Sequence, residues 1–266
     1  MLLYDVLSEK TKFADEFMKE PFMPVTSGLE SIDDHAGKLN PGETIILTSA
    51  DAVTKTAFAL NIAVKNASFQ RIPAVMFSSL MPVEQIAKWV IMSLNDHQIM
   101  SKHTPLYLEA VDKLNAADLK EKIVSLKRSS LVEIVIIDSI DMVYRSLPDT
   151  DGQRIKAIYD FVHELKLLAK ELNMILILTA SIMDKLELPK EIAAVEPLAD
   201  AVISVYMMER YEDRNKRIVE VSRNGKCVAA REVMFNRRHA RFYDIGEDDE
   251  PPIYNEEFIR EQSFNK

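Results

Sequence analysis

Residues 45–60 constrain the fold most, because three local patterns follow one another within this short stretch. A β-branched apolar run (IILT) leads into a short polar loop, and an apolar helical pattern then starts at Lys55-Thr56. A strand followed by a loop and a helix is the unit from which helix-covered sheets are built. At such a junction the order G-x-x-x-x-G-K-[ST] forms a loop whose backbone N–H groups bind phosphate.

Both glycine positions of that pattern are changed. Ser49 and Thr54 occupy them, and no glycine lies between Gly42 and Gly152. Asp51 adds a carboxylate inside the loop, where like charge weakens phosphate binding. The candidate nucleotide-binding residues are Ser49, Asp51, Thr54, Lys55, Thr56 and Asp138, with Thr56 and Asp138 as the candidate Mg²⁺ ligands.

Strands and helices are expected to alternate along most of the chain. Apolar runs predict strands at residues 43–48, 73–78, 106–108, 132–138 and 174–179, and helical patterns predict helices at 55–67, 82–94, 116–127 and 155–172. This order predicts an α/β fold with a mainly parallel sheet covered by helices on both faces. Further strands at 201–207, 217–222 and 233–243, two of them joined across Asn224-Gly225, predict an antiparallel edge.

In a parallel sheet of this kind, ligands bind beyond the carboxyl ends of the strands. The loops at residues 48–56, 78–81, 138–141 and 179–181 are therefore expected to lie side by side. Their convergence supports a binding crevice independently of the loop pattern itself.

Composition limits the classes of function. The 266 residues carry a formal net charge of −9, which argues against unspecific binding of nucleic-acid backbone. A lone cysteine, Cys227, fits a reducing cytoplasm, and no apolar run approaches the ~18–20 residues that a membrane span needs. We expect three parts: an amphipathic helix within residues 1–24, a core domain over 25–245 and an acidic flexible tail over 246–266.

These segments, in this order, resemble the RecA-like C-terminal motor domain of DnaB-type replicative DNA helicases over residues 25–245. The most specific match is KTAFALNIA at 55–63, and LKLLAKEL at 165–172 and Arg223-Asn224-Gly225 also match family motifs. The resemblance implies a RecA-like P-loop NTPase fold, ATP and Mg²⁺ as cofactors, a hexameric ring and translocation on single-stranded DNA. In position, the helix within residues 1–24 resembles the helicase linker helix that docks on a neighbouring subunit; packing on its own domain is the alternative.

The departures from the family concentrate in the chemistry. Leu80 stands where the family's catalytic glutamate is expected, and leucine cannot polarise water. Ala180 replaces the glutamine that senses the γ-phosphate, and Val221 replaces the first base of K-x-R-N-G. Residues 184–198 lack the family's basic DNA-binding loop. The candidate catalytic residues that remain are Lys55, Asp138 and Arg223.

Each remaining residue has a functional and a structural interpretation. Lys55-Thr56 either bind phosphate and Mg²⁺ or only begin a helix, and Asp138 either holds Mg²⁺ or ends a strand. Arg223 is either a trans-acting finger or a charge at a hairpin tip. The basic cluster Arg237, Arg238 and Arg241, interleaved with Phe235, Phe242 and Tyr243, either binds nucleic acid by charge and stacking or blocks pairing of an edge strand, which is the favoured interpretation.

The lead hypothesis is a DnaB-helicase-like protein that has lost ATP hydrolysis and acts as a binding or regulatory component in DNA replication. Its partners would be copies of itself, single-stranded DNA or an active helicase, with no membrane. The alternatives are a divergent working ATPase that uses Glu84 to orient water, and a scaffold that forms rings and binds DNA without nucleotide.

Overall fold

The computed structural model describes residues 24–79, 81–94, 104–111, 115–145, 147, 152–183, 188–207 and 213–246. The helix expected within residues 1–24 and nearly all of the expected acidic tail lie outside these ranges. Across the described ranges, no helix has the length and apolar character needed to cross a membrane.

The described residues form one nine-stranded sheet in the order β3-β2-β4-β5-β1-β6-β7-β8-β9. The parallel part comprises β3 (Leu106–Ala110), β2 (Ala74–Ser78), β4 (Ile134–Asp138), β5 (Ile175–Ser181), β1 (Thr44–Ser49) and β6 (Ala201–Tyr206). The antiparallel part comprises β7 (Lys216–Arg223), β8 (Lys226–Asn236) and β9 (Arg241–Asp244). The predicted α/β class, with a parallel centre and an antiparallel edge, is confirmed. The strand at 201–206, which was expected in the antiparallel edge, instead pairs parallel to β1.

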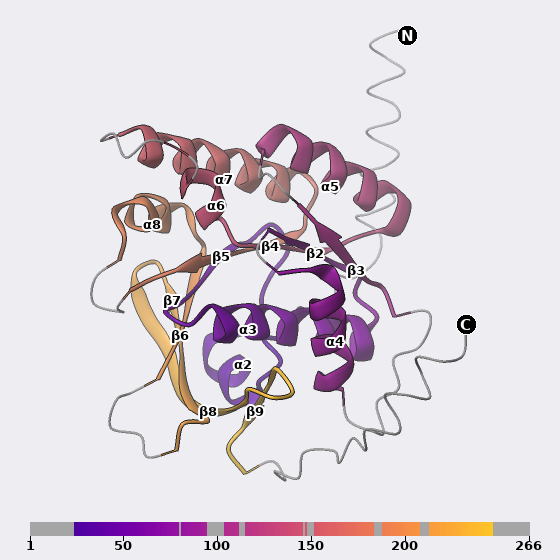
Figure 1. Cartoon of the computed structure of the whole chain (residues 1–266), viewed down its shortest axis with the longest axis vertical. Helices are drawn as coiled ribbons and strands as arrows, with labels where there is room; N and C mark the ends of the chain where they lie inside the picture. Colours follow the sequence, from indigo (N-terminus) through magenta and orange to yellow (C-terminus); the bar gives the residue numbers. More distant parts are fainter. Residues whose placement is uncertain are drawn as a thin grey trace, which may run out of the picture.

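Helices cover both faces of the parallel strands (Figure 1). One face carries α2 (Glu30–Ala36), α3 (Ala52–Lys65) with its π-helical continuation Asn66–Gln70, and α4 (Val83–Ser93). The other carries α5 (Ala116–Ser130), α6 (Asp141–Arg145), α7 (Gln153–Glu171) and α8 (Lys190–Val195), which runs into the 3-10 turn Glu196–Leu198. Alternate residues of β1 enter the two hydrophobic clusters, Ile45 and Leu47 on the α3 side and Ile46 on the α7 side. This burial on both faces explains why β1 reads as a continuous apolar run.

The turn before α2 is tied to α3 by polar contacts and by a close approach. Asp33 accepts hydrogen bonds from the Thr26 hydroxyl and from the Ser27 N–H, the latter at 2.9 Å. Gly28 has φ +87°, and a Cβ atom there would lie 2.4 Å from the amide nitrogen of Asn61 on α3. That nitrogen donates to the Ser27 carbonyl at 3.3 Å. Only glycine meets both conditions at this position.

The single strand expected at 233–243 is wrong. β8 ends at Asn236, residues 237–240 form a turn, and β9 begins at Arg241. The turn closes because the Asn236 side-chain oxygen accepts the His239 N–H at 3.2 Å, and Ala240 takes the left-handed conformation with φ +48°. The predicted hairpin at Asn224-Gly225 is confirmed, with φ of +51° and +70° at these two residues.

Candidate nucleotide site

The carboxyl ends of β1, β4 and β5 meet beside the first turn of α3, as the alternation of strands and helices predicts. Ser49 of β1 pairs with Ser181 of β5, and β4 ends beside them at Asp138. Thr54, Lys55 and Thr56 are all buried against these strand ends. The topology therefore collects the predicted loop and strand-end residues in one place.

Lys55 is committed to a partner inside the chain. Its Nζ atom donates to Ser181 Oγ at 2.8 Å and lies 3.3 Å from Asp141 Oδ2, and the side chains of Lys55 and Asp141 are 1% and 0% exposed. The hydroxyls of Ser139 and Ser181 each donate to Asp141 Oδ2 at 2.6 Å, and the Ser181 N–H lies 3.1 Å from both carboxylate oxygens. Burial raises the pKa of Asp141, but Lys55 and these hydrogen bonds outweigh it and hold that pKa below its ordinary value.

Thr56 and Asp138, the candidate Mg²⁺ ligands, are brought together and bonded to each other. The Thr56 hydroxyl donates to Asp138 Oδ2 at 2.7 Å, and the Thr179 hydroxyl donates to Oδ1 at 2.5 Å. The described parts of the chain contain no group of three or more His, Cys, Asp or Glu side chains arranged to hold a metal ion. Each oxygen of the Asp138 carboxylate thus accepts a hydrogen bond from one threonine hydroxyl of the chain.

In the loop that leads into α3, the Asp51 carboxylate accepts hydrogen bonds from the first turn of the helix. Asp51 caps the helix, since its side chain accepts the Val53 N–H at 3.1 Å and the Thr54 hydroxyl at 2.7 Å. Ser49 stays at the end of β1, where its hydroxyl accepts the Asp51 N–H at 3.3 Å. No residue from 49 to 56 has a positive φ, so the alternation of right- and left-handed residues that builds an anion nest is missing.

Arg223 lies at the opposite end of the sheet from Lys55. Its guanidinium pairs with Glu43, immediately before β1, with Nη1–Oε1 at 2.7 Å and Nη2–Oε2 at 3.3 Å. Burial raises the pKa of Glu43, but the hydrogen bonds from Arg223 and Asn40 bring it below its ordinary value. Arg223 therefore cannot serve the Lys55 site of its own chain, and its action on a neighbouring chain stays a prediction.

The basic cluster is divided between two settings. Arg237 and Arg238 are exposed in the turn after β8, while Arg241 is on the edge strand β9. The idea that Phe235 and Phe242 stack on bases is wrong, because both rings are buried. They stack on each other with centroids 4.5 Å apart, and Phe242 meets Phe58 of α3 edge-on at 5.0 Å. These aromatic residues belong to the core beneath α3.

The positions that depart from the family have different settings. Leu80 and residues 184–187 of the segment 184–198 lie outside the described residues, so their roles stay predictions. Ala180 is buried within β5, and Val221 is buried in the core on β7. Sequence reasoning missed Asp141 and Ser181 as partners of Lys55. The spacing D-x-x-D, which begins at the last residue of the buried strand, was the available signal for Asp141.

The parallel strand order, the strand–loop–helix unit over 44–65 and the Lys55, Thr56 and Asp138 set define the class as a RecA-like P-loop NTPase fold. The family model for the DnaB-like helicase C-terminal domain matches residues 24–103 and 93–244. The chain belongs to that family.

Two relatives are replicative DNA helicases named DnaB. The protein of Leifsonia xyli subsp. xyli is 25% identical over 264 residues, covering 83% of this chain and 56% of that protein. The protein of Haemophilus influenzae is 24% identical over 266 residues, covering 85% of this chain and 56% of that protein. The chain thus spans about half the length of these curated relatives.

Solved structures share the fold at low identity. One of them, described as an ATPase domain, superposes with a TM-score of 0.69 at 17% identity, covering 91% of this chain and 98% of that one. A DnaB-like replicative helicase, described with its interactions with primase, gives a TM-score of 0.69 at 17% identity, covering 88% of this chain and 67% of that one. A KaiC-like protein from Pyrococcus horikoshii OT3 gives 0.66 at 19% identity, covering 84% of this chain and 99% of that one.

Proposed function

We propose that this chain is a DnaB-family protein that does not hydrolyse ATP and acts as a binding or regulatory component in DNA replication. The observation that carries the proposal is the position of Lys55, which is buried and bonded to Asp141 and Ser181. A phosphate-binding lysine must direct its ammonium to the β- and γ-phosphates. Here the same charge neutralises a carboxylate of its own chain.

Two further features of the loop support loss of hydrolysis. A triphosphate at the N-terminus of α3 would meet the Asp51 carboxylate, and like charges repel there. The loop also lacks the left-handed residues that glycines supply, so its N–H groups are not arranged around one anion. In addition, the sequence has Leu80 in place of the glutamate that would orient water.

The partners are proposed from the family. The relatives are replicative DNA helicases, and one solved neighbour is described with its interactions with primase. We infer that this chain acts beside such a helicase, either within a ring of its own copies or by contact with the helicase. Single-stranded DNA is the second proposed ligand, with Arg237, Arg238 and Arg241 as the candidate contacts.

One observation favours a divergent working ATPase as the second candidate. The Thr56 hydroxyl lies 2.7 Å from Asp138, so the two residues that hold magnesium in P-loop enzymes remain side by side. Glu84 is exposed in the first turn of α4 and would replace the missing water-orienting residue. In this case Lys55 would exchange Asp141 for the nucleotide when it binds.

The rate of ATP hydrolysis by the purified chain, with and without single-stranded DNA, separates the two candidates. The replicative helicase of Haemophilus influenzae is the positive control, and the Lys55→Met variant reports contamination. We expect no rate above that of Lys55→Met, whereas a rate comparable to the control that Lys55→Met abolishes would establish the working enzyme. Calorimetric titration with Mg²⁺-ATP then tests whether nucleotide binds without being hydrolysed.

A further inference from the structure

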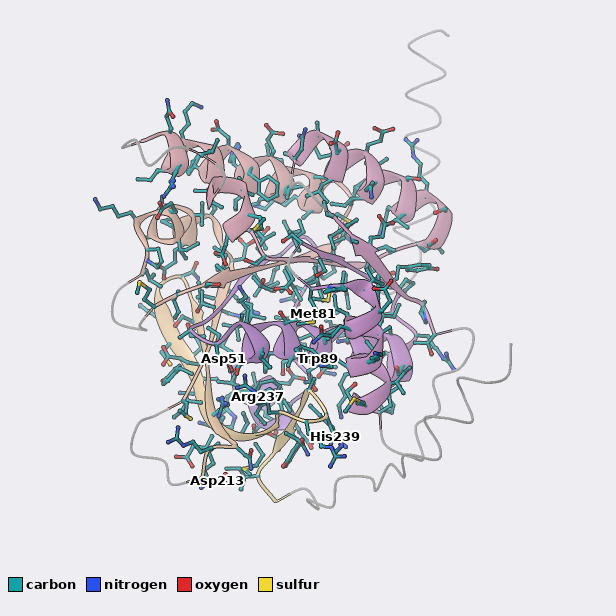
Figure 2. All side chains as sticks on the ribbon, viewed as in Figure 1. Asp51, Met81, Trp89, Asp213, Arg237 and His239 are labelled. Atoms are coloured by element: carbon teal, nitrogen blue, oxygen red, sulfur yellow. The ribbon has the colours of Figure 1, made fainter. Side chains whose placement is uncertain are left out.

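The Asp51 carboxylate is held by three donors from two separate parts of the chain. Val53 N–H and the Thr54 hydroxyl belong to the first turn of α3. The third donor is Arg237 Nη1, which lies 3.1 Å from Asp51 Oδ2 and comes from a turn 186 residues further along the chain. Figure 2 shows Asp51 and Arg237 next to each other at the start of α3. The first two contacts make the helix cap, and the third adds an ion pair whose Arg237 and Asp51 side chains are 60% and 38% exposed.

Positive charge gathers around this carboxylate. Arg217 of β7 is 6% exposed, and its guanidinium lies over the Phe235 ring at 5.2 Å while donating to the carbonyls of Arg214 and Lys216. Burial lowers the pKa of Arg217, Arg237 lowers it further, and Asp51 is the strongest of the charges that oppose this. Two arginines and the N-terminus of α3 therefore act on one carboxylate, which is the electrostatic setting that proteins use for phosphate.

We propose that Asp51 is a built-in anion which, latched by Arg237, keeps phosphate groups away from the N-terminus of α3. The contact is autoinhibitory: the carboxylate takes the hydrogen bonds and the charge that a polyphosphate would otherwise take. When the carboxylate is neutral or displaced, Arg237 becomes a ligand for that polyphosphate. The inference deepens the proposed function, and it rests on that function only in assigning a cause to the proposed loss of ATP hydrolysis.

The Asp51→Asn variant tests the latch, because asparagine keeps the shape and one oxygen to cap the helix, while it removes the charge and replaces the other oxygen by an NH₂ group. Binding of inorganic tripolyphosphate and of Mg²⁺-ATP is measured by calorimetry for the original chain and the variant. We expect affinity for both to rise at least about tenfold, since one like-charge contact is removed. The matched control is Asp160→Asn, which removes an exposed carboxylate on α7 and should leave both affinities unchanged.

Two more variants define the mechanism. Asp51→Ser keeps a good helix cap by different chemistry, and it should reproduce the gain if Asp51→Asn does not fold. Arg237→Gln placed on the Asp51→Asn background should abolish most of the gain, because it removes the freed cation.

Three outcomes would overturn the inference. Affinities of folded Asp51→Asn and Asp51→Ser within twofold of the original would show that Asp51 is a helix cap only. If the gain in affinity persists in the Arg237→Gln double variant, Arg237 has no part in the mechanism. If affinity rises for Mg²⁺-ATP but not for tripolyphosphate, repulsion between Asp51 and phosphate is not the cause. Hydrolysis by the original chain would refute the proposed function but leave the comparison between variants readable, so the two failures are distinguishable.

Discussion

Replacing either member of the Lys55–Asp141 pair should destabilise the folded chain strongly, because both side chains are removed from solvent. The Asp141→Asn variant keeps the size of the side chain and one acceptor oxygen, but it leaves the Lys55 ammonium without a counter-charge at 3.3 Å. The Lys55→Met variant keeps the length of the side chain and removes the counter-charge of the Asp141 carboxylate, which keeps its hydrogen bonds from Ser139 and Ser181.

The size of the effect follows from burial. Breaking a buried ion pair by removing one partner costs about 3–5 kcal/mol, since the remaining charge keeps its desolvation penalty and loses its attraction. With about 2–4 °C per kcal/mol for a domain of this size, the midpoint of thermal unfolding should fall by about 6–20 °C.

Urea unfolding and calorimetry of the two single variants and the double variant measure the coupling. The double variant buries no unpaired charge, so its loss should be smaller than the sum of the single losses by at least about 1.5 kcal/mol. Asp160→Asn is the control, because its pair with Lys156 is exposed and such pairs contribute about 0.3–0.5 kcal/mol. Additive losses below about 1 kcal/mol each would refute the reasoning and show that the Lys55 ammonium reaches solvent, as a working nucleotide site requires.

Two further predictions concern the region around α3 and β9. Gly28→Ala should lower the free energy of unfolding by about 1–3 kcal/mol, because alanine is strained at φ +87° and its Cβ meets Asn61. Gly37→Ala is the control for backbone strain alone, since φ there is +72° but no atom lies within 4 Å of the added Cβ. Equal losses of stability in the two variants would show that the contact with Asn61 contributes nothing. Burial, and then the charges of Arg238 and Arg241, lower the pKa of His239 below its ordinary 6.5. As the pH falls, His239 therefore binds a proton in the unfolded chain before it does so in the folded chain. Stability that is present above pH 6.5 is lost as the pH falls below that value. Urea midpoints at about pH 5 and about pH 8 should differ less in His239→Gln than in the original chain, and an unchanged difference would exclude His239 as its source.

Local pattern was sufficient for most of the architecture. β1 and β4 are buried on both faces, so their positions were readable as uninterrupted apolar runs bounded by polar loops. The hairpin at Asn224-Gly225 was readable because its turn needs two residues that tolerate positive φ. The strand at 233–243 was misjudged because the turn at 237–240 contains neither glycine nor proline and is closed by a side-chain contact from Asn236.

The sequence by itself determined the RecA-like order of strands and helices. It located Lys55 and Thr56 at the start of the helix that follows β1, and Asp138 at the end of β4. It also showed that the loop had lost its glycines and gained Asp51. These features depend on residues close together in the chain, whose spacing and polarity suffice to define them.

Only the tertiary structure decided what those side chains contact. Lys55 meets an aspartate 86 residues away, Asp51 meets an arginine 186 residues away, and Arg223 meets a glutamate 180 residues away. Such pairs depend on strand order and on the direction in which each side chain leaves its strand or helix, and local sequence spacing contains neither. The physical reason is that burial, rather than residue type, determines whether a lysine at the start of α3 is available to a ligand or neutralised within the fold.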